Sequence, residues 1–589
     1  CSSLRSVTGR AAGTPAERQW ASIIPTQAVA TMLSSAAVAV RRVAGAAGAS
    51  AARGGAGAGR RAIHASAAVA DFKAPLNEVK FLANEVHNLQ DHYSKLEHTG
   101  GAGADEDMVD MVLSEMGRFC EQELSPLNEV GDRVGCQHLG DYEVKTPPGF
   151  KEAYDTFTAG GWQGLSYPEK YGGQGLPYSL AMLGTEMAAT ACWTWTMYPG
   201  LSKGAINTIL EHGTDALKDK YLPPLISGEW TGTMCLTEPQ CGSDLAQVST
   251  KAVPQPDGSY KITGTKIFIS CGDHDMTENV VHCVLARLPD APEGIKGISL
   301  FLVPKRKVGD DGANGDLNGC KIGRIEDKMG CHGSSTCEIN FEDAEGFLIG
   351  TANRGMNHMF TFINTSRLGT AVQGVAAAEL SFQNALWYAK ERLAMRSLTG
   401  KKNPSGPADP IIVHPDVRRM LLTQKAIAEG GRSMVYECAL LNDVQMEAEA
   451  RGDEKAVRKT DDRMGFLTPI LKGFLTERGN EAAYLGVQIY GGHGYIKDNK
   501  QEQVMRDVRI ASVWEGTTGI QGLDLLGRKI MLQKLKPINE HCGLLRAEAV
   551  KLISSGSSGA VKRHALTMLR YSFEWQGGGP PPAPGARAE

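Results

Sequence analysis

The sequence predicts an α+β protein with an N-terminal helical domain, a middle β-barrel or β-sandwich domain and a C-terminal four-helix bundle. Apolar residues recur at helical spacing over 71–231 and alternate with period two over 232–350. Long amphipathic helical segments return over 351–535, which favours a bundle. We expect two flanking segments outside these domains, at residues 1–70 and at 536–589, the second of them partly disordered.

The segment 1–70 has a composition of its own. Arginine recurs without any lysine, Ala, Ser and Gly supply most of the rest, and Glu17 is the only acidic residue before Asp71. This composition is typical of an organellar transit peptide, and an ordinary disordered tail is the alternative. Met32 is a candidate translation start. The chemistry of the motifs below favours the mitochondrial matrix over a plastid.

Bulk composition excludes several classes of function. The chain has 589 residues, 42% hydrophobic content and a net charge of −4, so it can bury several cores but lacks a basic field for nucleic acid. No apolar run reaches transmembrane length, because two arginines interrupt the longest candidate at 36–52. The 13 scattered cysteines indicate reduced thiols. We expect no metal site, since Cys331, His332 and Cys337 lie at loose spacing without a fourth ligand.

Each domain is predicted from its own local pattern. In the N-terminal domain, residues 79–89 and 105–124 have helical spacing on either side of a Gly-rich break. In the middle domain, residues 260–269 alternate after a Pro-Asp-Gly turn, and three more strands are expected. These strands are 280–288, 298–303 and 337–341. In the C-terminal domain, a Pro/Gly/Ser loop at 403–410 separates two long helices, and the tail at 576–589 is too rich in Gly and Pro to pack.

Two loops of the middle domain stand out. Residues 234–244 read Met-Cys-Leu-Thr-Glu-Pro-Gln-Cys-Gly-Ser-Asp, and residues 268–272 read Phe-Ile-Ser-Cys-Gly at the end of a predicted strand. Pro and Gly let backbone N–H groups converge on an oxygen-rich ligand without side-chain obstruction. Taken alone, the first loop could be a polar turn and Phe268 a core residue.

Four further motifs lie in the C-terminal domain: Phe-Ile-Asn-Thr-Ser-Arg at 362–367, Tyr-Ala-Lys-Glu-Arg at 388–392, Gln-Ile-Tyr-Gly-Gly-His-Gly at 488–494, and Arg-Asp at 506–507 followed by Trp-Glu-Gly-Thr at 514–517. In these motifs, residues 72–535 resemble the acyl-CoA dehydrogenase family. The resemblance implies that family's fold, an FAD cofactor, and oxidation of an acyl-CoA to a trans-2-enoyl-CoA.

The resemblance assigns the two middle-domain loops to the flavin. Thr237 would bond the pyrimidine side of the ring, and Ser243 would reach the cofactor phosphate or the acyl-CoA. Phe268, Ile269 and Ser270 would line the flavin, with the Phe268 ring over its face and the Ser270 hydroxyl near N5. The family usually has Trp at position 268 and Thr at position 270.

A second group would bind the FAD of a neighbouring subunit. Arg392 would pair with the pyrophosphate, as its planar guanidinium suits phosphate oxygens. Gln488, Gly491 and Gly492 would lie along the adenosine half. Read alone, Arg392 could be a solvated helix charge and the glycines a helix stop. The family's His-Gln is represented here by His414 followed by Pro, after an insertion at 396–412, so His414 is the remaining cofactor contact.

The resemblance makes Glu515 the catalytic base that removes the α-hydrogen of the thioester. In the family, the backbone N–H of this residue and a ribityl hydroxyl of FAD stabilise the enolate oxygen. Gly516 would let the chain turn beside the substrate, and Thr517 would hold the cofactor. Arg367 would lie near the base and the CoA chain. Some members carry the base directly before this arginine, but Ser366 stands there in this chain.

Within the family, the chain resembles a long subgroup that includes 3-methylthiopropionyl-CoA dehydrogenases, through residues 72–76, 328–337 and 406–419. The implied partners are an acyl-CoA, an electron-transfer flavoprotein and further copies of the chain in a homodimer or homotetramer. Two alternatives stay open. An acyl-CoA oxidase would share the fold and the base but use oxygen. A non-catalytic assembly-factor homologue would not need Glu515.

Overall fold

The computed structural model describes residues 72–576, so the predicted transit peptide and the end of the Gly/Pro-rich tail lie outside the described residues. The described chain divides into two units. The larger unit comprises 72–76 and 96–529, and the smaller one comprises 77–95 and 530–576. Within 72–576, no helix is both long enough and apolar enough to cross a membrane.

The N-terminal part of the larger unit is helical, as predicted. Helix α5 begins after Asp105, whose carboxylate accepts a hydrogen bond from the Met108 N–H at 2.8 Å. Its Val and Met side chains at 109, 112 and 116 are buried, so this apolar stripe is core. The helices of this part are η3 (Gly101–Gly103), α5 (Glu106–Phe119), η4 (Cys120–Leu124), α6 (Ser125–Val134), α7 (Phe150–Ala159), η5 (Trp162–Gly164), η6 (Glu169–Tyr171), α8 (Tyr178–Ala191), α9 (Trp193–His212) and α10 (Asp215–Ser227).

The middle domain is a barrel. Strand β11 pairs with β5 and β7, β5 with β4, and both β4 and β7 with β6, so these five strands close a ring. Strand β10 extends the sheet beside β11, and β3 runs parallel to β6. The strands are β3 (Trp230–Cys235), β4 (Lys251–Pro254), β5 (Tyr260–Ser270), β6 (Asn279–Arg287), β7 (Ile298–Pro304), β10 (Cys320–Ile325) and β11 (Thr336–Ile349), with small hairpins β1 (Gln137–Gly140)–β2 (Glu143–Lys145) and β8 (Arg306–Val308)–β9 (Asn314–Leu317), and turns η7 (Leu245–Gln247) and η8 (Ile295–Gly297).

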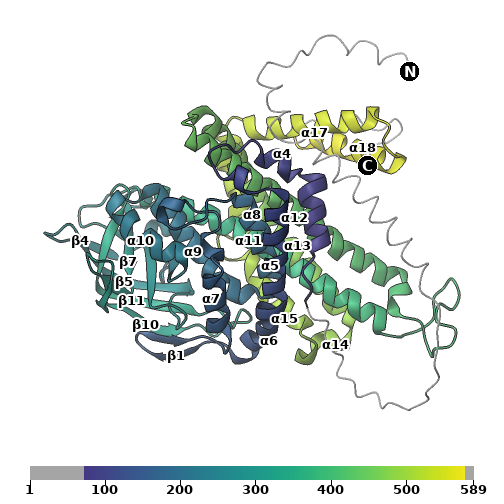
Figure 1. Ribbon diagram of the computed structural model, residues 1–589, viewed down its shortest axis with the longest axis horizontal. Helices are drawn as coiled ribbons and strands as arrows, with labels where there is room; N and C mark the ends of the chain where they lie inside the picture. The colour runs from purple at the N-terminus through teal and green to yellow at the C-terminus, as the bar shows by residue number, and fades with distance from the viewer. Residues whose placement is uncertain (1–71, 577–589) are drawn as a thin grey trace, which may run out of the picture. The chain divides into compact units, whose positions relative to one another are not determined.

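Strand β6 explains why part of this domain lacks alternation. Cys283 and Leu285 pack in one core with residues of α9 and α10, whereas Val284 and Ala286 pack in a second core with Phe301 and other barrel residues. Both faces of the strand are therefore covered, which requires a continuous apolar run. Figure 1 shows α9 and α10 beside the strands.

The C-terminal domain contains three helices of 36 or 37 residues, and shorter segments follow them in place of a fourth long helix. The helices are α11 (Gly355–Glu391), η9 (Ile411–Val413), α12 (Pro415–Ala450), α13 (Glu454–Tyr490), α14 (Gly492–Tyr495), η10 (Lys497–Asn499), α15 (Gln501–Arg509), η11 (Ile510–Ser512), α16 (Thr518–Leu523) and η12 (Asp524–Met531). The predicted α+β fold, helical, then β, then helical, is confirmed.

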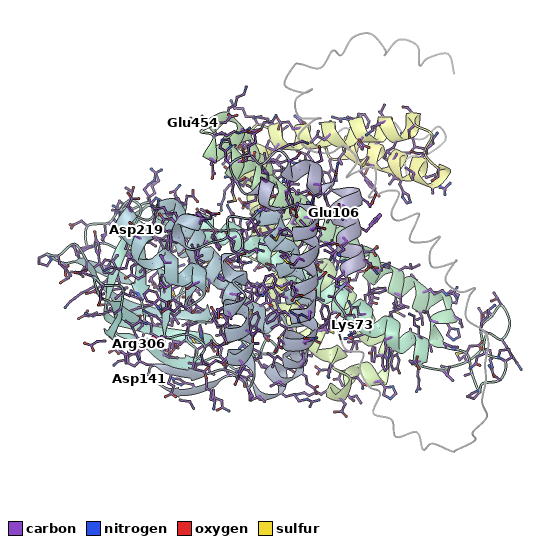
Figure 2. The ribbon with its side chains drawn as sticks, in the orientation of Figure 1. Lys73, Glu106, Asp141, Asp219, Arg306 and Glu454 are labelled. Carbon is purple, nitrogen blue, oxygen red and sulfur yellow. The ribbon has the colours of Figure 1, made fainter. Side chains whose placement is uncertain are left out.

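A buried ion cluster joins the N-terminal helices to the long ones. Arg432 on α12 is fully buried and donates to Glu186 on α8 at 2.9 and 3.0 Å and to Glu379 on α11 at 3.1 Å. By contrast, Glu106, Asp219 and Glu454 are exposed (Figure 2). The cluster therefore fixes how three helices pack.

The smaller unit has a core of its own. Helices α17 (Lys536–Ser554) and α18 (Gly559–Glu574) pack on each other around Ala549, Leu552, Val561 and Ala565. The other elements are α3 (Leu76–Phe81), which begins in the larger unit, η2 (Leu82–Val86) and α4 (Leu89–Tyr93). The sequence pattern did not predict α18, because it lies close to the Gly/Pro-rich tail.

Candidate active site

Glu515 lies in a sharp turn between η11 and α16. Its φ is 54° and that of Gly516 is 87°, so both residues adopt the left-handed conformation. For a residue other than glycine this conformation costs about 1–2 kcal/mol, and the surroundings must hold it. Thr517 then starts α16, where its hydroxyl accepts a hydrogen bond from the Ile520 N–H at 3.3 Å.

Two side chains hold the carbonyl groups of this turn. Gln521 Nε2 donates to the Glu515 oxygen at 3.0 Å and to the Gly516 oxygen at 3.1 Å. Lys472 Nζ, from α13, donates to the same Gly516 oxygen at 2.6 Å. Both donors belong to buried residues, so the turn is fixed from the protein interior.

The charges around Glu515 set its acidity. Burial raises the pKa of its carboxyl to about 7, although the positive charges of Arg367 and Lys472 act to lower it. Arg367, buried on α11, donates to Asp524 at 2.8 Å. A carboxyl that titrates near neutral pH suits general base catalysis, because it is ionised in part and still basic.

An aromatic wall adjoins the turn. The rings of Trp514 and Trp193 have centroids 6.4 Å apart. Among the described residues, the buried indole nitrogens of both, and the buried Nε of Arg367, have no hydrogen-bond partner. Buried donors are nearly always paired in folded proteins. These three N–H groups are what a polar ligand at this site would satisfy.

The Thr-Glu-Pro loop after β3 is held by its glutamate. Glu238 is buried and accepts hydrogen bonds from the backbone and hydroxyl groups of Ser249 and Thr250 and from Lys266 Nζ, at 2.6–3.0 Å. Thr237 beside it is half-buried, and Ser243 is exposed farther along the loop. Glu238 is thus an anchor, which leaves Thr237 and Ser243 on the accessible side.

Phe268 lies next to this loop. The Thr237 carbonyl accepts a hydrogen bond from the Ile267 N–H at 2.9 Å, so the two predicted flavin motifs meet. Phe268 has a φ of 59° and its side chain is 60% exposed, while Ile269 is buried and Ser270 is half-buried. The Phe268 ring is exposed and therefore does not contribute to the packing of the hydrophobic core. The residues present fit FAD, because the ring is free to cover a planar ligand.

The second predicted group lies far from Arg367 along the long helices. Arg392 caps the C-terminal end of α11, 25 residues beyond Arg367, which is about 37 Å of helix. Gln488, Gly491 and Gly492, at the end of α13, are exposed. Tyr388 ties the two helix ends together, since its ring stacks on Tyr490 at 4.1 Å and its hydroxyl bonds His493 at 2.8 Å.

The inserted loop between α11 and α12 uses His414 for its own structure. His414 Nε2 lies 2.9 Å from the Ala394 carbonyl oxygen. At the loop's centre, buried Asp409 accepts from the N–H groups of Ser397, Lys402 and Asn403. The Ser397 N–H is the main cause that lowers the pKa of Asp409 to about 2, with help from the other N–H groups.

The two cysteines of the 328–337 segment, Cys331 and Cys337, are buried. Cys331 donates its N–H to Asp507 at 2.6 Å, and the His332 ring contacts Asp132 and the Lys328 carbonyl. Over residues 72–576, no cluster of three or more His, Cys, Asp or Glu side chains could hold a metal ion.

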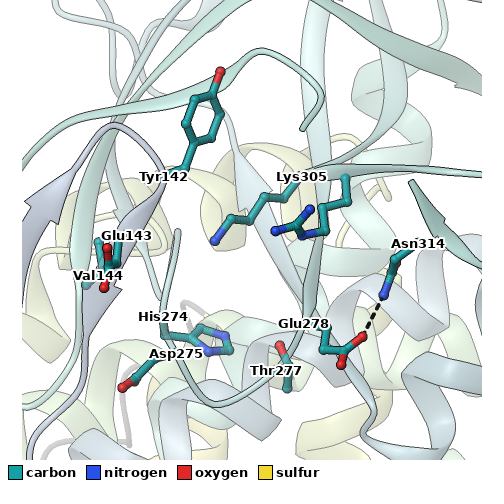
Figure 3. Close-up of a pocket in the computed structure, with 10 residues that line it drawn as sticks. Tyr142, Glu143, Val144, His274, Asp275, Thr277, Glu278, Lys305 and Asn314 are labelled. Carbon is teal, nitrogen blue, oxygen red and sulfur yellow. Dashed lines mark hydrogen bonds between the residues drawn. The ribbon is translucent and has the colours of Figure 1, made fainter. Parts of the chain in front are cut away.

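A hollow of about 470 Å³ in the β domain lies away from these residues. Tyr142, Lys305 and Glu278 surround it (Figure 3). Its His274 bonds Thr231 near the start of β3, whereas the Thr237 loop follows the other end of that strand. None of the residues that line the hollow is a predicted flavin residue, so the hollow is outside the predicted flavin site.

Comparison with known proteins decides the family. Residues 106–229, 233–344 and 353–531 match the N-terminal, middle and C-terminal domain models of acyl-CoA dehydrogenases. The chain is 41% identical over 508 residues to a 3-methylmercaptopropionyl-CoA dehydrogenase of Ruegeria pomeroyi, covering 85% of this chain and 84% of that protein.

The chain belongs to the acyl-CoA dehydrogenase family. A second relative, a broad-specificity linear acyl-CoA dehydrogenase of Mycobacterium tuberculosis, is 35% identical over 82% of this chain and 79% of that protein. The structure of butyryl-CoA dehydrogenase from Megasphaera elsdenii aligns with a TM-score of 0.58 and 25% identity, over 72% of this chain and 98% of that chain. The protein is accordingly a flavin-dependent oxidoreductase, and the predicted family, reaction class and FAD cofactor are confirmed.

The prediction of a mitochondrial location is wrong. The relatives that match most of this acyl-CoA dehydrogenase are bacterial enzymes, which gives no support to a transit peptide or an organelle. The error has a simple cause: an Arg-, Ala- and Ser-rich composition is a weak indicator of a targeting sequence, because many unrelated segments share it.

Sequence reasoning missed four residues around these sites. Lys472, Gln521 and Asp524 belong to helical patterns in which nothing marks them as neighbours of Glu515. The role of Glu238 as an anchor could have been predicted, because a carboxylate inside a Pro/Gly loop needs several hydrogen-bond donors around it.

Proposed function

We propose that Glu515 is the catalytic base that removes the α-proton of an acyl-CoA thioester, leading to a trans-2-enoyl-CoA. The observation that supports this most strongly is the Glu515 turn, where burial raises the pKa of the carboxyl to about 7 beside two cations. A base of this strength is half ionised near neutral pH and can take up the proton.

The chain's own residues would bind, orient and shield the substrate. Trp514 and Trp193, whose rings lie against each other, would exclude water beside the carboxyl, which would strengthen the electrostatic interactions there. The turn, held by Lys472 and Gln521, leaves the Glu515 N–H to polarise the thioester oxygen as the α-proton departs. Arg367 would lie along the acyl-CoA near the reacting carbons.

The FAD site would be formed by Thr237, Ser243, Phe268, Ile269, Ser270 and Thr517. FAD, when bound, supplies the acceptor for the β-hydrogen and its pair of electrons. Arg392, Gln488, Gly491 and Gly492 are exposed, and Arg392 lies about 37 Å along α11 from Arg367, a distance that suits contact with the cofactor of a neighbouring subunit. We therefore infer a homodimer or homotetramer, in which His414 shapes the inserted loop and reaches the cofactor only through it.

We infer a short thioether or linear acyl group as the substrate, because the relative that is 41% identical over 85% of the chain is a 3-methylmercaptopropionyl-CoA dehydrogenase. An electron-transfer flavoprotein is the proposed electron acceptor. Anaerobic reduction followed by exposure to oxygen separates this proposal from an oxidase, since an oxidase would reoxidise rapidly.

A panel of acyl-CoA thioesters, including 3-methylthiopropionyl-CoA and butyryl-CoA, tests the function with an artificial electron acceptor. We expect Glu515→Gln to keep its flavin absorbance and lose turnover by about 100-fold or more, as loss of a general base does. Glu481→Gln, which changes a half-buried glutamate paired with Arg478 on α13, is the control and should retain turnover. Full turnover by Glu515→Gln would refute the role of Glu515.

A further inference from the structure

Lys472 has an unusual environment for a lysine. It lies in the middle of α13, its side chain is fully buried, and its Nζ donates to the Gly516 carbonyl oxygen at 2.6 Å. A buried ammonium is costly unless it is paired with a negative charge. A carbonyl oxygen alone does not supply that charge, so Lys472 needs another reason to be there.

Three charged groups act on Lys472: Glu515 in the turn, Arg367 on α11 and Glu477 on α13 itself. Burial lowers its pKa to about 8, Glu515 and Glu477 act to raise it, and Arg367 acts to lower it. Arg367 is itself paired with Asp524 at the start of η12. Of the two negative charges that act on Lys472, Glu515 has the larger effect, and Glu477 is exposed to solvent.

We propose that Lys472 is a positioning residue for Glu515: it holds the Gly516 carbonyl, so that the left-handed turn is kept, and its charge favours the ionised carboxylate. This inference rests on the proposed role of Glu515 as the base. In this role Lys472 acts through the turn, by way of the Gly516 carbonyl oxygen.

The geometry explains why a cation is used in addition to an amide. Gln521 already donates to the carbonyl oxygens of both Glu515 and Gly516, so a neutral clamp exists without Lys472. An ammonium group adds a charge-assisted hydrogen bond to the same oxygen and a favourable field at the nearby carboxylate. The two donors therefore have different roles. Gln521 holds the backbone of the turn, and Lys472 holds the same backbone and also favours the ionised carboxylate of Glu515.

Three variants separate these two contributions. Lys472→Met removes the hydrogen bond and the charge, Lys472→Gln keeps a donor without the charge, and Lys472→Arg keeps both. A matched control is Lys203→Met, since Lys203 on α9 also has a pKa lowered by burial to about 8, and its Nζ donates to the Thr185 hydroxyl at 2.8 Å. The readout is the pH dependence of kcat, together with flavin absorbance and the thermal midpoint.

We expect the acidic limb of the profile to move upward by about one pH unit in Lys472→Met and Lys472→Gln, because an adjacent cation typically shifts a carboxyl by this order. Lys472→Arg should keep the limb near the wild-type position, and Lys203→Met should not move it. On the plateau, Lys472→Gln should exceed Lys472→Met because it retains the donor. A merely structural lysine would lower kcat or stability without moving the limb.

A limb at the wild-type position in Lys472→Gln would overturn the proposal, as would an equal shift in Lys203→Met. If Lys472→Met does not fold, the comparison of Lys472→Gln with Lys472→Arg still shows whether the charge at position 472 moves the acidic limb. Failure of the proposed function looks different: Glu515→Gln would then keep turnover. Failure of this inference alone leaves Glu515→Gln inactive and the Lys472 variants with a wild-type limb.

Discussion

Removing the charge of Glu238 should destabilise the flavin loop and the β domain together. Burial raises the pKa of this carboxyl, but the charge and hydrogen bond of Lys266 and the donors of Thr250 and Ser249 outweigh it and lower the pKa from 4.5 to about 2. The shift corresponds to about 3 kcal/mol of stability at neutral pH. Burial lowers the pKa of Lys266, which offsets part of this gain.

Glu238→Gln keeps the shape of the side chain but places an amide N–H opposite the donors of Ser249 or Lys266. It also leaves Lys266, which is fully buried, without its counter-charge. Loss of one partner of a buried pair typically costs about 3–5 kcal/mol, in line with the figure from the pKa. We therefore expect the free energy of unfolding to fall by about 3 kcal/mol at pH 7.

Urea denaturation followed by tryptophan fluorescence measures this loss of stability. The ratio of flavin to protein after gel filtration measures how well the loop still holds the flavin. The stabilisation by Glu238 is fully present above the unfolded pKa of 4.5 and disappears as the pH falls towards 2, so the difference from wild type should shrink over that window. Glu229→Gln, at an exposed position before β3, should change stability by less than about 0.5 kcal/mol. A loss below about 1 kcal/mol with full flavin content would refute the reasoning.

Two further variants test the packing and the flavin site. Arg432→Met leaves the buried carboxylates of Glu186 and Glu379 without a cation, and we expect a loss of about 3–5 kcal/mol in urea denaturation, whereas a loss below 1 kcal/mol would contradict a structural role. Phe268→Gly removes an exposed ring and relieves a φ of 59°, so the flavin-free protein should lose no stability while flavin retention falls. Unchanged retention in gel filtration would exclude the ring from the flavin site.

The fold could be predicted because periodicity is a local signal. Val and Met at helical spacing marked α5, and the alternation over residues 260–269 marked β5. Helix α18 was missed because its neighbouring Gly/Pro-rich tail dominated the composition. The continuous apolar run of β6 predicted a strand. It did not predict that both faces of the strand are buried, because this depends on helices that are far away in sequence.

Only those residues of the candidate site that belong to a recognisable short motif could be predicted from the sequence. Glu515 and Thr237 stand in short sequences with Pro or Gly, whereas Lys472 and Gln521 stand in helices and meet the turn only after folding. His414 stays a predicted cofactor contact, and the sequence did not predict that its ring also bonds the Ala394 carbonyl within the inserted loop. Long-range contacts of this kind leave no trace in spacing.

The central claim, that Glu515 is the base, is tested most directly by the pH dependence of single-turnover flavin reduction by an acyl-CoA. Stopped-flow absorbance of the wild type should show a rate that rises tenfold per pH unit at low pH and levels off above about 7, where the carboxyl is ionised. Glu515→Gln, with flavin retained, should show a residual rate without this limb. A variant that keeps both the limb and the rate would contradict the account.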